Sequence, residues 1–189
     1  MSKYLETRRP NPETDAVSEE ATFQKSNFRI IGLAVVIFAL DQIAKWRLLR
    51  SLGEIPGNER VIIPGFFKFV HWGNTGAAWS LFNGNNGALA LVALLALVAL
   101  FLTRHHFDSH TLMGQIAFGL IFGGIAGNLA DRLFRGEVVD FIRFYMEQRD
   151  GGEIGFPAFN IADSAICTGV GLIFLITWRN EHRPPKAAP

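Results

Sequence analysis

Residues Gly123 to Asp163 read GGIAGNLADRLFRGEVVDFIRFYMEQRDGGEIGFPAFNIAD, and among the carboxylates of this stretch we single out Asp131, Asp140 and Asp163, which lie between or beside two long apolar runs. A carboxylate beside a bilayer is costly to keep, so each of the three needs a reason to be there. Asp140, in VVDFI, and Asp163, in IADSA, have apolar neighbours on both sides, whereas Asp131 is followed directly by Arg132. Asp140 and Asp163 are therefore our candidates for an aspartic catalytic pair.

The composition excludes several classes of protein. The chain has 189 residues, of which 49% are hydrophobic and 17 are Phe, so it suits one domain of ordinary size and is too apolar to be disordered. A formal net charge of +1 gives no field that would attract nucleic acid. The single cysteine, Cys167, rules out an intramolecular disulfide and a CxxC metal site, and no histidine pair has HExxH spacing. We expect no metal and no cofactor.

Four apolar runs are long enough to cross a bilayer, which needs about 20 residues. They are Phe28–Leu49, Gly87–Thr103, Leu112–Ala130 and Phe159–Trp178. The second, containing LALVALLALVALFL, has no polar face of the kind that a helix in a soluble bundle repeats about every 3.6 residues. The sequence therefore predicts an all-α membrane protein with four transmembrane helices.

The polar segments set the domain boundaries. Residues 1–27 are polar and contain two prolines, so we expect a disordered tail there, followed by a four-span domain over 28–180 and a C-terminal tail over 181–189. Residues 51–86 combine turn signals with branched and aromatic runs, which predicts a small extramembrane β-rich cradle between helices 1 and 2.

The third run carries Gly119, Gly123 and Gly127 at four-residue spacing. Small residues on one face of a helix allow a neighbouring helix to approach closely. We interpret these glycines as a helix-packing seam.

The number of spans alone predicts that the polar residues lie at one membrane face. With four spans, both termini lie on one side, and the first and third connections lie on the other. The polar residues that this brings to one membrane face are Asp41, Asn74, Asn128, Asp131, Arg132, Asp140, Asn160 and Asp163. Lysines and arginines are divided evenly between the two sides, so the positive-inside rule does not give the orientation.

Two carboxylates that share one proton can hydrolyse a peptide bond without metal. The ionised carboxylate takes a proton from water, the protonated one donates to the carbonyl oxygen, and like-charge repulsion keeps the two pKa values apart. Spacing alone leaves other roles open. Asp131 could pair with Arg135, and Asp41 with Lys45, at i,i+4. Asn160 could cap a helix, and Asp140 could be a turn carboxylate.

Five motifs occur in order across residues 28–180: LDQIAK at 40–45, NTGAAWS at 74–80, GNLADR at 127–132, VVDF at 138–141 and FNIADS at 159–164. Together they resemble the signature blocks of the lipoprotein signal peptidases, the bacterial signal peptidase II family of membrane aspartic endopeptidases. The resemblance implies that Asp140 and Asp163 are the catalytic pair and that Asp131 supports them. It implies that the active site is lined or braced by Asp41, Asn74, Asn128, Arg132, Asn160 and Ala162.

The resemblance also implies a substrate and a location. Members of this family remove the signal peptide from prolipoproteins, cutting just before a diacylglyceryl-modified cysteine, and the cyclic peptide globomycin inhibits them. Their termini are cytoplasmic, and their active site lies at the outer leaflet of the bacterial cytoplasmic (inner) membrane, which would make residues 51–86 periplasmic. Two features depart from the family pattern: the long N-terminal tail and a polar insert at residues 147–153.

Two other functions fit parts of the sequence. A small proton-coupled transporter would use Asp41, Asp140 and Asp163 as an ion relay, but its carboxylates should follow a path through the bilayer instead of clustering at one face. A non-catalytic assembly protein would explain the glycine seam but would leave the aspartates without a role.

Overall fold

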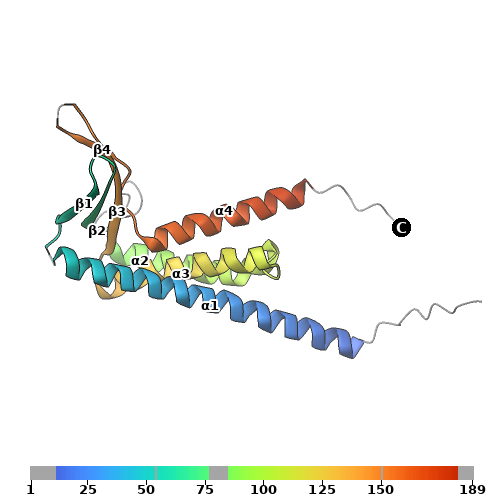
Figure 1. Cartoon of the computed structure of the whole chain (residues 1–189). Coiled ribbons are helices and arrows are strands. Elements are labelled where there is room, and N and C mark those ends of the chain that lie inside the picture. The colour runs from blue at the N-terminus through green and yellow to red at the C-terminus, as the bar shows by residue number, and fades with distance from the viewer. Residues whose placement is uncertain (1–11, 54, 77–84, 150, 183–189) are drawn as a thin grey trace, which may run out of the picture.

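The computed structural model describes residues 12–53, 55–76, 85–149 and 151–182, with side chains from Ser26 onward. Within these residues, four helices are long and apolar enough to cross a membrane. They are α1 (Pro12–Leu52), α2 (Asn86–Thr103), α3 (Leu112–Phe134) and α4 (Ile161–Glu181), and they form a bundle (Figure 1). A short 3-10 helix, η2 (Arg104–Phe107), follows α2. The prediction of four spans is confirmed.

The first helix begins earlier than expected. Helix α1 starts at Pro12, so the prediction of a disordered tail is wrong for residues 12–27. Proline favours the first position of a helix, because its missing N–H would have no partner there and its φ angle is already helical. Residues 1–11 of the predicted tail, and 183–189 of the predicted C-terminal tail, lie outside the described part of the chain.

Helix α3 lies at the centre of the bundle, and its glycines set the packing distances. A Cβ atom on Gly119 would lie 2.8 Å from the Leu33 side chain, and one on Gly123 would lie 2.6 Å from the carbonyl oxygen of Ala34, both on α1. On the other side, a Cβ atom on Gly124 would lie 2.5 Å from the carbonyl oxygen of Ala162 on α4. The predicted packing seam is confirmed, and it brings α1 and α4 against α3.

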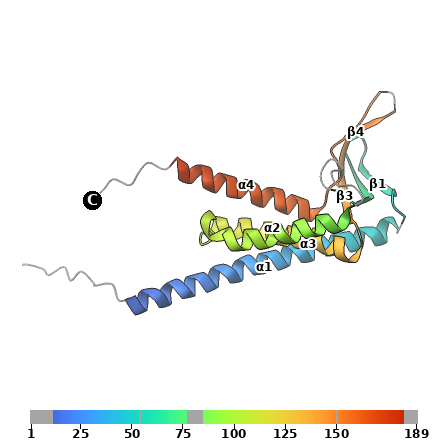
Figure 2. The same ribbon diagram turned by 180° about the vertical axis from the view of Figure 1, so that it is seen from behind.

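A four-stranded antiparallel sheet stands at one end of the bundle (Figures 1 and 2). Its order is β1-β2-β3-β4, with bounds β1 (Glu59–Ile63), β2 (Phe67–Asn74), β3 (Val138–Glu147) and β4 (Glu153–Gly155). The start of α1 and the end of α4 lie at the opposite end of the bundle (Figure 1). The first and third connections therefore meet at one end, as the span count predicted.

The sheet extends the predicted β-rich cradle. The sequence predicts the cradle only between helices 1 and 2, but half of the strands come from the connection between α3 and α4. Strand β3 was missed because Val138 to Phe141 are all buried, which removes the alternation of polar and apolar residues that identifies a strand. Residues 77–84 of the predicted cradle lie outside the described residues.

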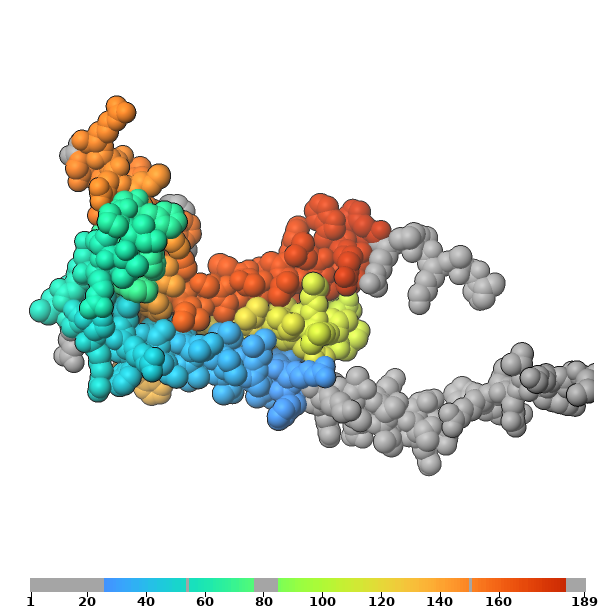
Figure 3. All heavy atoms as spheres, in the orientation of Figure 1, coloured from blue at the N-terminus to red at the C-terminus, as the bar shows by residue number. Residues whose placement is uncertain are grey.

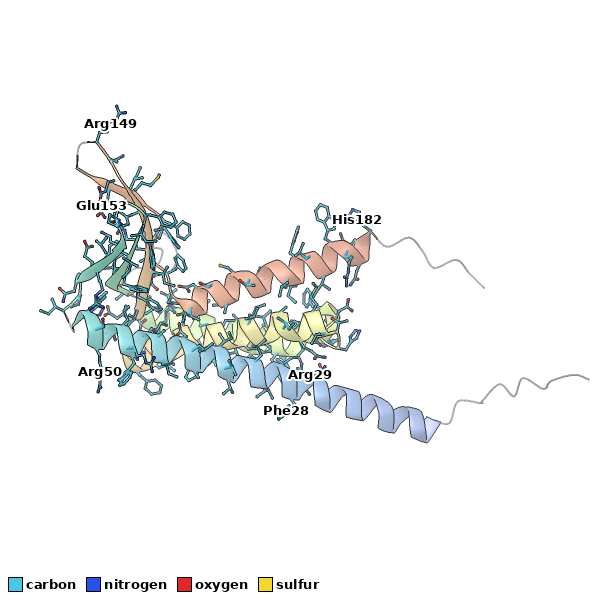
Figure 4. All side chains as sticks on the ribbon, viewed as in Figure 1. Phe28, Arg29, Arg50, Arg149, Glu153 and His182 are labelled. Atoms are coloured by element: carbon cyan, nitrogen blue, oxygen red, sulfur yellow. The ribbon has the colours of Figure 1, made fainter. Side chains whose placement is uncertain are left out.

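The polar insert at 147–153 has a simple structural explanation. Glu147 and Glu153 are cross-strand partners, so the insert forms the outer end of the β3–β4 hairpin. Figure 4 shows Arg149 at the tip of this hairpin, well away from the helices. The hairpin makes the sheet project sideways beyond the bundle, which is visible in the space-filling view (Figure 3).

Candidate active site

The structure brings Asp140 and Asp163 into one hydrogen-bonded cluster through two asparagines. Asn160 Nδ2 donates to Asp140 Oδ1 at 2.9 Å, and Asn128 Nδ2 donates to Asp163 Oδ1 at 2.7 Å. Asn160 Nδ2 also lies 3.1 Å from Asn128 Oδ1, so the two amides bond to each other. Four residues from α3, β3 and the start of α4 therefore form one chain of hydrogen bonds from carboxylate to carboxylate.

Asp163 is oriented by the start of its own helix. Asn160 is the N-cap of α4, and its side chain accepts a hydrogen bond from the Asp163 N–H at 2.9 Å, while Asp163 Oδ2 accepts one from the Asn160 N–H at 3.2 Å. This reciprocal capping box satisfies N–H groups at the start of the helix. Asn160 is therefore the helix cap that the sequence left open, and its side chain also donates a hydrogen bond to Asp140.

Asp140 is positioned by the sheet. It is the cross-strand partner of Trp72 on β2, and the last residue of β2, Asn74, donates from Nδ2 to Asp140 Oδ2 at 2.9 Å. Asp140 is 4% exposed. Asp140 is thus a strand residue and not a turn carboxylate.

The environment of Asp140 favours its protonated form. Burial, together with the negative charge of Asp163, raises its pKa to about 7, although the hydrogen bond from Asn74, the charge of Lys45 and the hydrogen bond from Asn160 act in the opposite direction. A carboxyl group with such a pKa holds a proton at near-neutral pH and can give it up there. One proton shared with Asp163 would supply an acid and a base in the same site.

A buried ion cluster lies beneath the two aspartates. Lys45 Nζ is 2.7 Å from Asp41 Oδ2 and 2.6 Å from Asp131 Oδ2, and all three side chains are fully buried. Asp41 Oδ1 accepts the N–H of Ala162, the residue before Asp163, at 3.0 Å. Asp131 Oδ2 accepts the N–H of Val139, the residue before Asp140, at 3.3 Å. We call Asp41, Lys45 and Asp131 the lower cluster.

The lower cluster refines three sequence predictions. The i,i+4 pairs Asp41–Lys45 and Asp131–Arg135 are both present. Asp131 and Asp41 nevertheless do more than form ion pairs, since each also holds the backbone beside one candidate catalytic residue. The sequence does not predict that Lys45 also pairs with Asp131, because the contact of α1 with α3 that brings the two together has no local signal.

Arg132 and Ala162 have distinct positions. Arg132 donates to the carbonyl oxygens of Asn128 at 3.4 Å and Gly76 at 3.3 Å, so it joins α3 to the segment after β2. Ala162 contributes its backbone N–H, and its side chain is fully buried. Every predicted site residue is therefore near the aspartate pair or its supports, although residues 77–80 of the NTGAAWS motif lie outside the described chain. Among the described residues, no group of three or more His, Cys, Asp or Glu is arranged to hold a metal ion.

The chain is similar to known proteins over most of its length. The family model described as Signal peptidase (SPase) II matches residues 33–179. A lipoprotein signal peptidase from Symbiobacterium thermophilum is 38% identical over 146 residues, covering 77% of this chain and 91% of that protein. A lipoprotein signal peptidase from Bacillus pumilus is 35% identical over 144 residues, covering 76% of this chain and 88% of that protein.

The fold is shared with solved membrane proteins. A bacterial membrane enzyme solved by the in meso method at 2.3 Å resolution superposes with a TM-score of 0.67 at 32% identity, covering 85% of this chain and 94% of that one. A second, solved at 1.9 Å, has a TM-score of 0.65 at 33% identity. With a family match over most of its length and relatives above 30% identity, this multi-pass chain belongs to the signal peptidase II family and is a membrane protease.

Proposed function

We propose that this protein cleaves the signal peptide from prolipoproteins immediately before a diacylglyceryl-modified cysteine, with Asp140 and Asp163 as a water-activating pair. The observation that carries the proposal is the bridge of Asn128 and Asn160 between the two carboxylates. It brings together two acidic groups from two different elements, β3 and α4, in surroundings that raise the pKa of Asp140 to about 7.

The pair acts through one shared proton. The ionised carboxylate removes a proton from a water molecule as its oxygen attacks the scissile carbonyl carbon, and the protonated carboxyl group donates its proton to the carbonyl oxygen. The resulting tetrahedral diol collapses when a proton passes to the leaving nitrogen, which breaks the C–N bond. Because the two groups are coupled, they titrate as a pair, and the roles of acid and base belong to the pair.

The position of the site suits a lipid-anchored substrate. Asp140 lies on β3 and Asp163 in the first turn of α4, and both elements meet at the end of the bundle that carries the sheet (Figure 1). In this proposal that end lies at a bilayer surface. The acyl chains of the substrate would stay in lipid while its signal helix lies beside the spans, so orientation would come from anchoring and would need little side-chain recognition. In this proposal the sheet end faces the outer leaflet of the bacterial inner membrane, both termini are cytoplasmic, and globomycin competes for the site.

The transporter hypothesis fits the geometry less well. A proton relay needs carboxylates at successive depths of the bilayer. Here Asp41, Asp131, Asp140 and Asp163 belong to one connected cluster at the sheet end, and α2 contains no charged residue. The membership of the chain in a peptidase family also favours hydrolysis.

The direct test uses the full chain purified in detergent, a diacylglyceryl-modified prolipoprotein and no added metal. Asp140→Asn and Asp163→Asn should each lower kcat by about 10⁴-fold or more, as losses in a cooperating catalytic unit do. Asp108→Asn, at an αL position after η2, is the matched control and should keep wild-type turnover. Globomycin binding by each variant reports whether the site is still folded. Near-wild-type turnover by either candidate variant would refute the pair and favour the transporter.

A further inference from the structure

A pocket lies where the end of α1 meets strands β2 and β3. It has a volume of about 480 Å³, and its lining includes Trp46 and Arg50 near the end of α1, His71 on β2, and Arg135 and Glu137 after α3. Val139 also lines it. Side chains of neighbouring strand residues point to opposite faces, so the Val139 side faces away from the side that carries Asp140. The pocket is therefore separate from the proposed catalytic site.

His71 lines this pocket and has a buried polar atom without a hydrogen-bond partner among the described residues. The residue is 6% exposed, and the atom in question is its Nδ1. Its backbone is fixed by two hydrogen bonds, from its N–H to the Asn58 carbonyl and from the Gly57 N–H to its own carbonyl. Leaving a buried polar atom unpaired costs about 1–3 kcal/mol, so such atoms normally have a partner. A ligand in the pocket would supply one.

The charge of the lining favours an anionic group. Arg50 and Arg135 are permanent cations, and the planar guanidinium group matches phosphate oxygens in a bidentate geometry. The Arg50 guanidinium lies 4.3 Å from the centre of the Trp46 ring, which holds it at the pocket. Arg135 uses Nη1 for Asp131 and Gln42, and a guanidinium group has five N–H donors in all. Glu137 is the one carboxylate among the described lining residues, so the two arginines leave the lining with an excess of positive charge.

The pocket lies at the depth of lipid headgroups. The α1 span runs from Ser26 to Leu52, so Arg50 is within its last turn, and Figure 4 shows Arg50 at the sheet end of the helix, pointing out of the bundle. Trp46 is 49% exposed, and tryptophan favours the membrane–water interface. Exposed apolar residues continue down the same helix below it, at Ile43, Leu40 and Val36.

We propose that this pocket binds the phosphate group of a membrane phospholipid, with its acyl chains lying along the exposed apolar side of α1. Arg50, Arg135 and His71 Nδ1 would donate hydrogen bonds to the phosphate oxygens. Ile43, Leu40 and Val36 would contact the acyl chains. The uncharged diacylglyceryl group of the proposed substrate has no phosphate, so this is a second lipid site that does not depend on the proposed cleavage.

The test measures lipid binding and not peptidase activity. Full-length protein, purified in detergent and stripped of lipid, is titrated with dioleoyl phosphatidylglycerol and followed by native mass spectrometry. Arg50→Glu should weaken binding at least tenfold. Arg47→Glu is the matched control, because it makes the same change of charge at an exposed position three residues earlier that is outside the pocket, and it should leave the Kd unchanged. His71→Leu should also weaken binding.

Three results would overturn the proposal. Equal losses in Arg50→Glu and Arg47→Glu would show only a general charge effect. Equal affinity for dioleoylglycerol, which lacks phosphate, would show that acyl chains alone bind. Equal affinity for soluble glycerol phosphate would mean that the site takes a free phosphate ester and not a membrane lipid.

Discussion

Two lysines in this protein each hold a pair of carboxylates, in very different surroundings. Lys45 Nζ lies 2.7 Å from Asp41 and 2.6 Å from Asp131, and all three side chains are 0% exposed. Lys68 Nζ lies 2.8 Å from Glu59 and 2.7 Å from Glu153, whose side chains are 45% and 34% exposed. The distances are alike, but only in the lower cluster are all of the side chains fully buried.

This difference determines what each cluster can do. The glutamates that pair with Lys68 remain partly exposed to solvent. Their ion pairs with Lys68 mainly link strands β1, β2 and β4. Burial alone would lower the pKa of Lys68, but hydrogen bonds to Glu153 and Glu59 and their charges outweigh it, so the pKa is raised. In the lower cluster, Asp41 and Asp131 instead bond to the backbone beside Asp163 and Asp140. Desolvated ion pairs can thus fix an active site that solvated ones could not.

The largest expected effect is that of Lys45→Met. The substitution leaves Asp41 and Asp131 buried without their shared cation, and breaking a buried ion pair in this way costs about 3–5 kcal/mol. The free energy of unfolding, measured by denaturant titration in detergent, should fall by that amount, and peptidase activity should be lost with it. If the loss of stability were no larger than that of Lys68→Met, the distinction between the two clusters would be wrong.

A smaller effect is expected from Gly127→Ala, which displaces one member of the lower cluster. The new Cβ atom would lie 2.8 Å from Asp41 Oδ2, so Asp41 must move away from the Ala162 N–H. We expect a loss of about 1–3 kcal/mol in stability, as for other overpacked sites, and a lower kcat. Gly32→Ala on α1 is the control, since nothing lies within 4 Å of its Cβ position. If Gly127→Ala and Gly32→Ala changed stability and kcat equally, the proposed role of the hydrogen bond between Asp41 and the Ala162 N–H would be wrong.

The next prediction concerns pH. The pKa of Asp140 is raised from 3.8 to about 7, so its contribution to stability is fully present below about pH 4 and is lost as the pH rises through 7. Activity, which needs the shared proton, should decline over the same upper range. Asn74→Leu removes a hydrogen bond that favours ionised Asp140, so it should move the alkaline limb of kcat/KM upward by about one pH unit. A downward shift would contradict this assignment.

The smallest effect should come from Lys68→Met. Its glutamates can be rehydrated, so the loss in stability should be about 1 kcal/mol or less and should shrink at high salt. Because Lys68 is remote from the groups that set the pKa of Asp140, the pH profile of activity should stay as in the wild type. A shifted pH profile would show that the ion pairs of Lys68 influence the pKa of Asp140. Assaying Lys68→Met and the wild-type protein side by side would reveal such a shift.

Some of the candidate site could be predicted because its signals are local or topological. Hydrophobic runs report spans directly, since each run must satisfy its own backbone hydrogen bonds in lipid. The pairs Asp41–Lys45 and Asp131–Arg135 follow from i,i+4 spacing on a helix. Strand β3 could not be predicted in the same way, because a strand buried on both faces has no alternating pattern.

The sequence by itself therefore determined the four spans, the end of the bundle where the polar residues gather, and the family motifs, because run length, span parity and motif order are properties of the chain alone. Only the tertiary structure decided that Lys45 joins Asp41 to Asp131, that Asn160 links Asp140 to Asn128, and that His71 faces a pocket. The physical reason is that desolvation and hydrogen bonding depend on partners up to 121 residues away, as for Asp41 and Ala162.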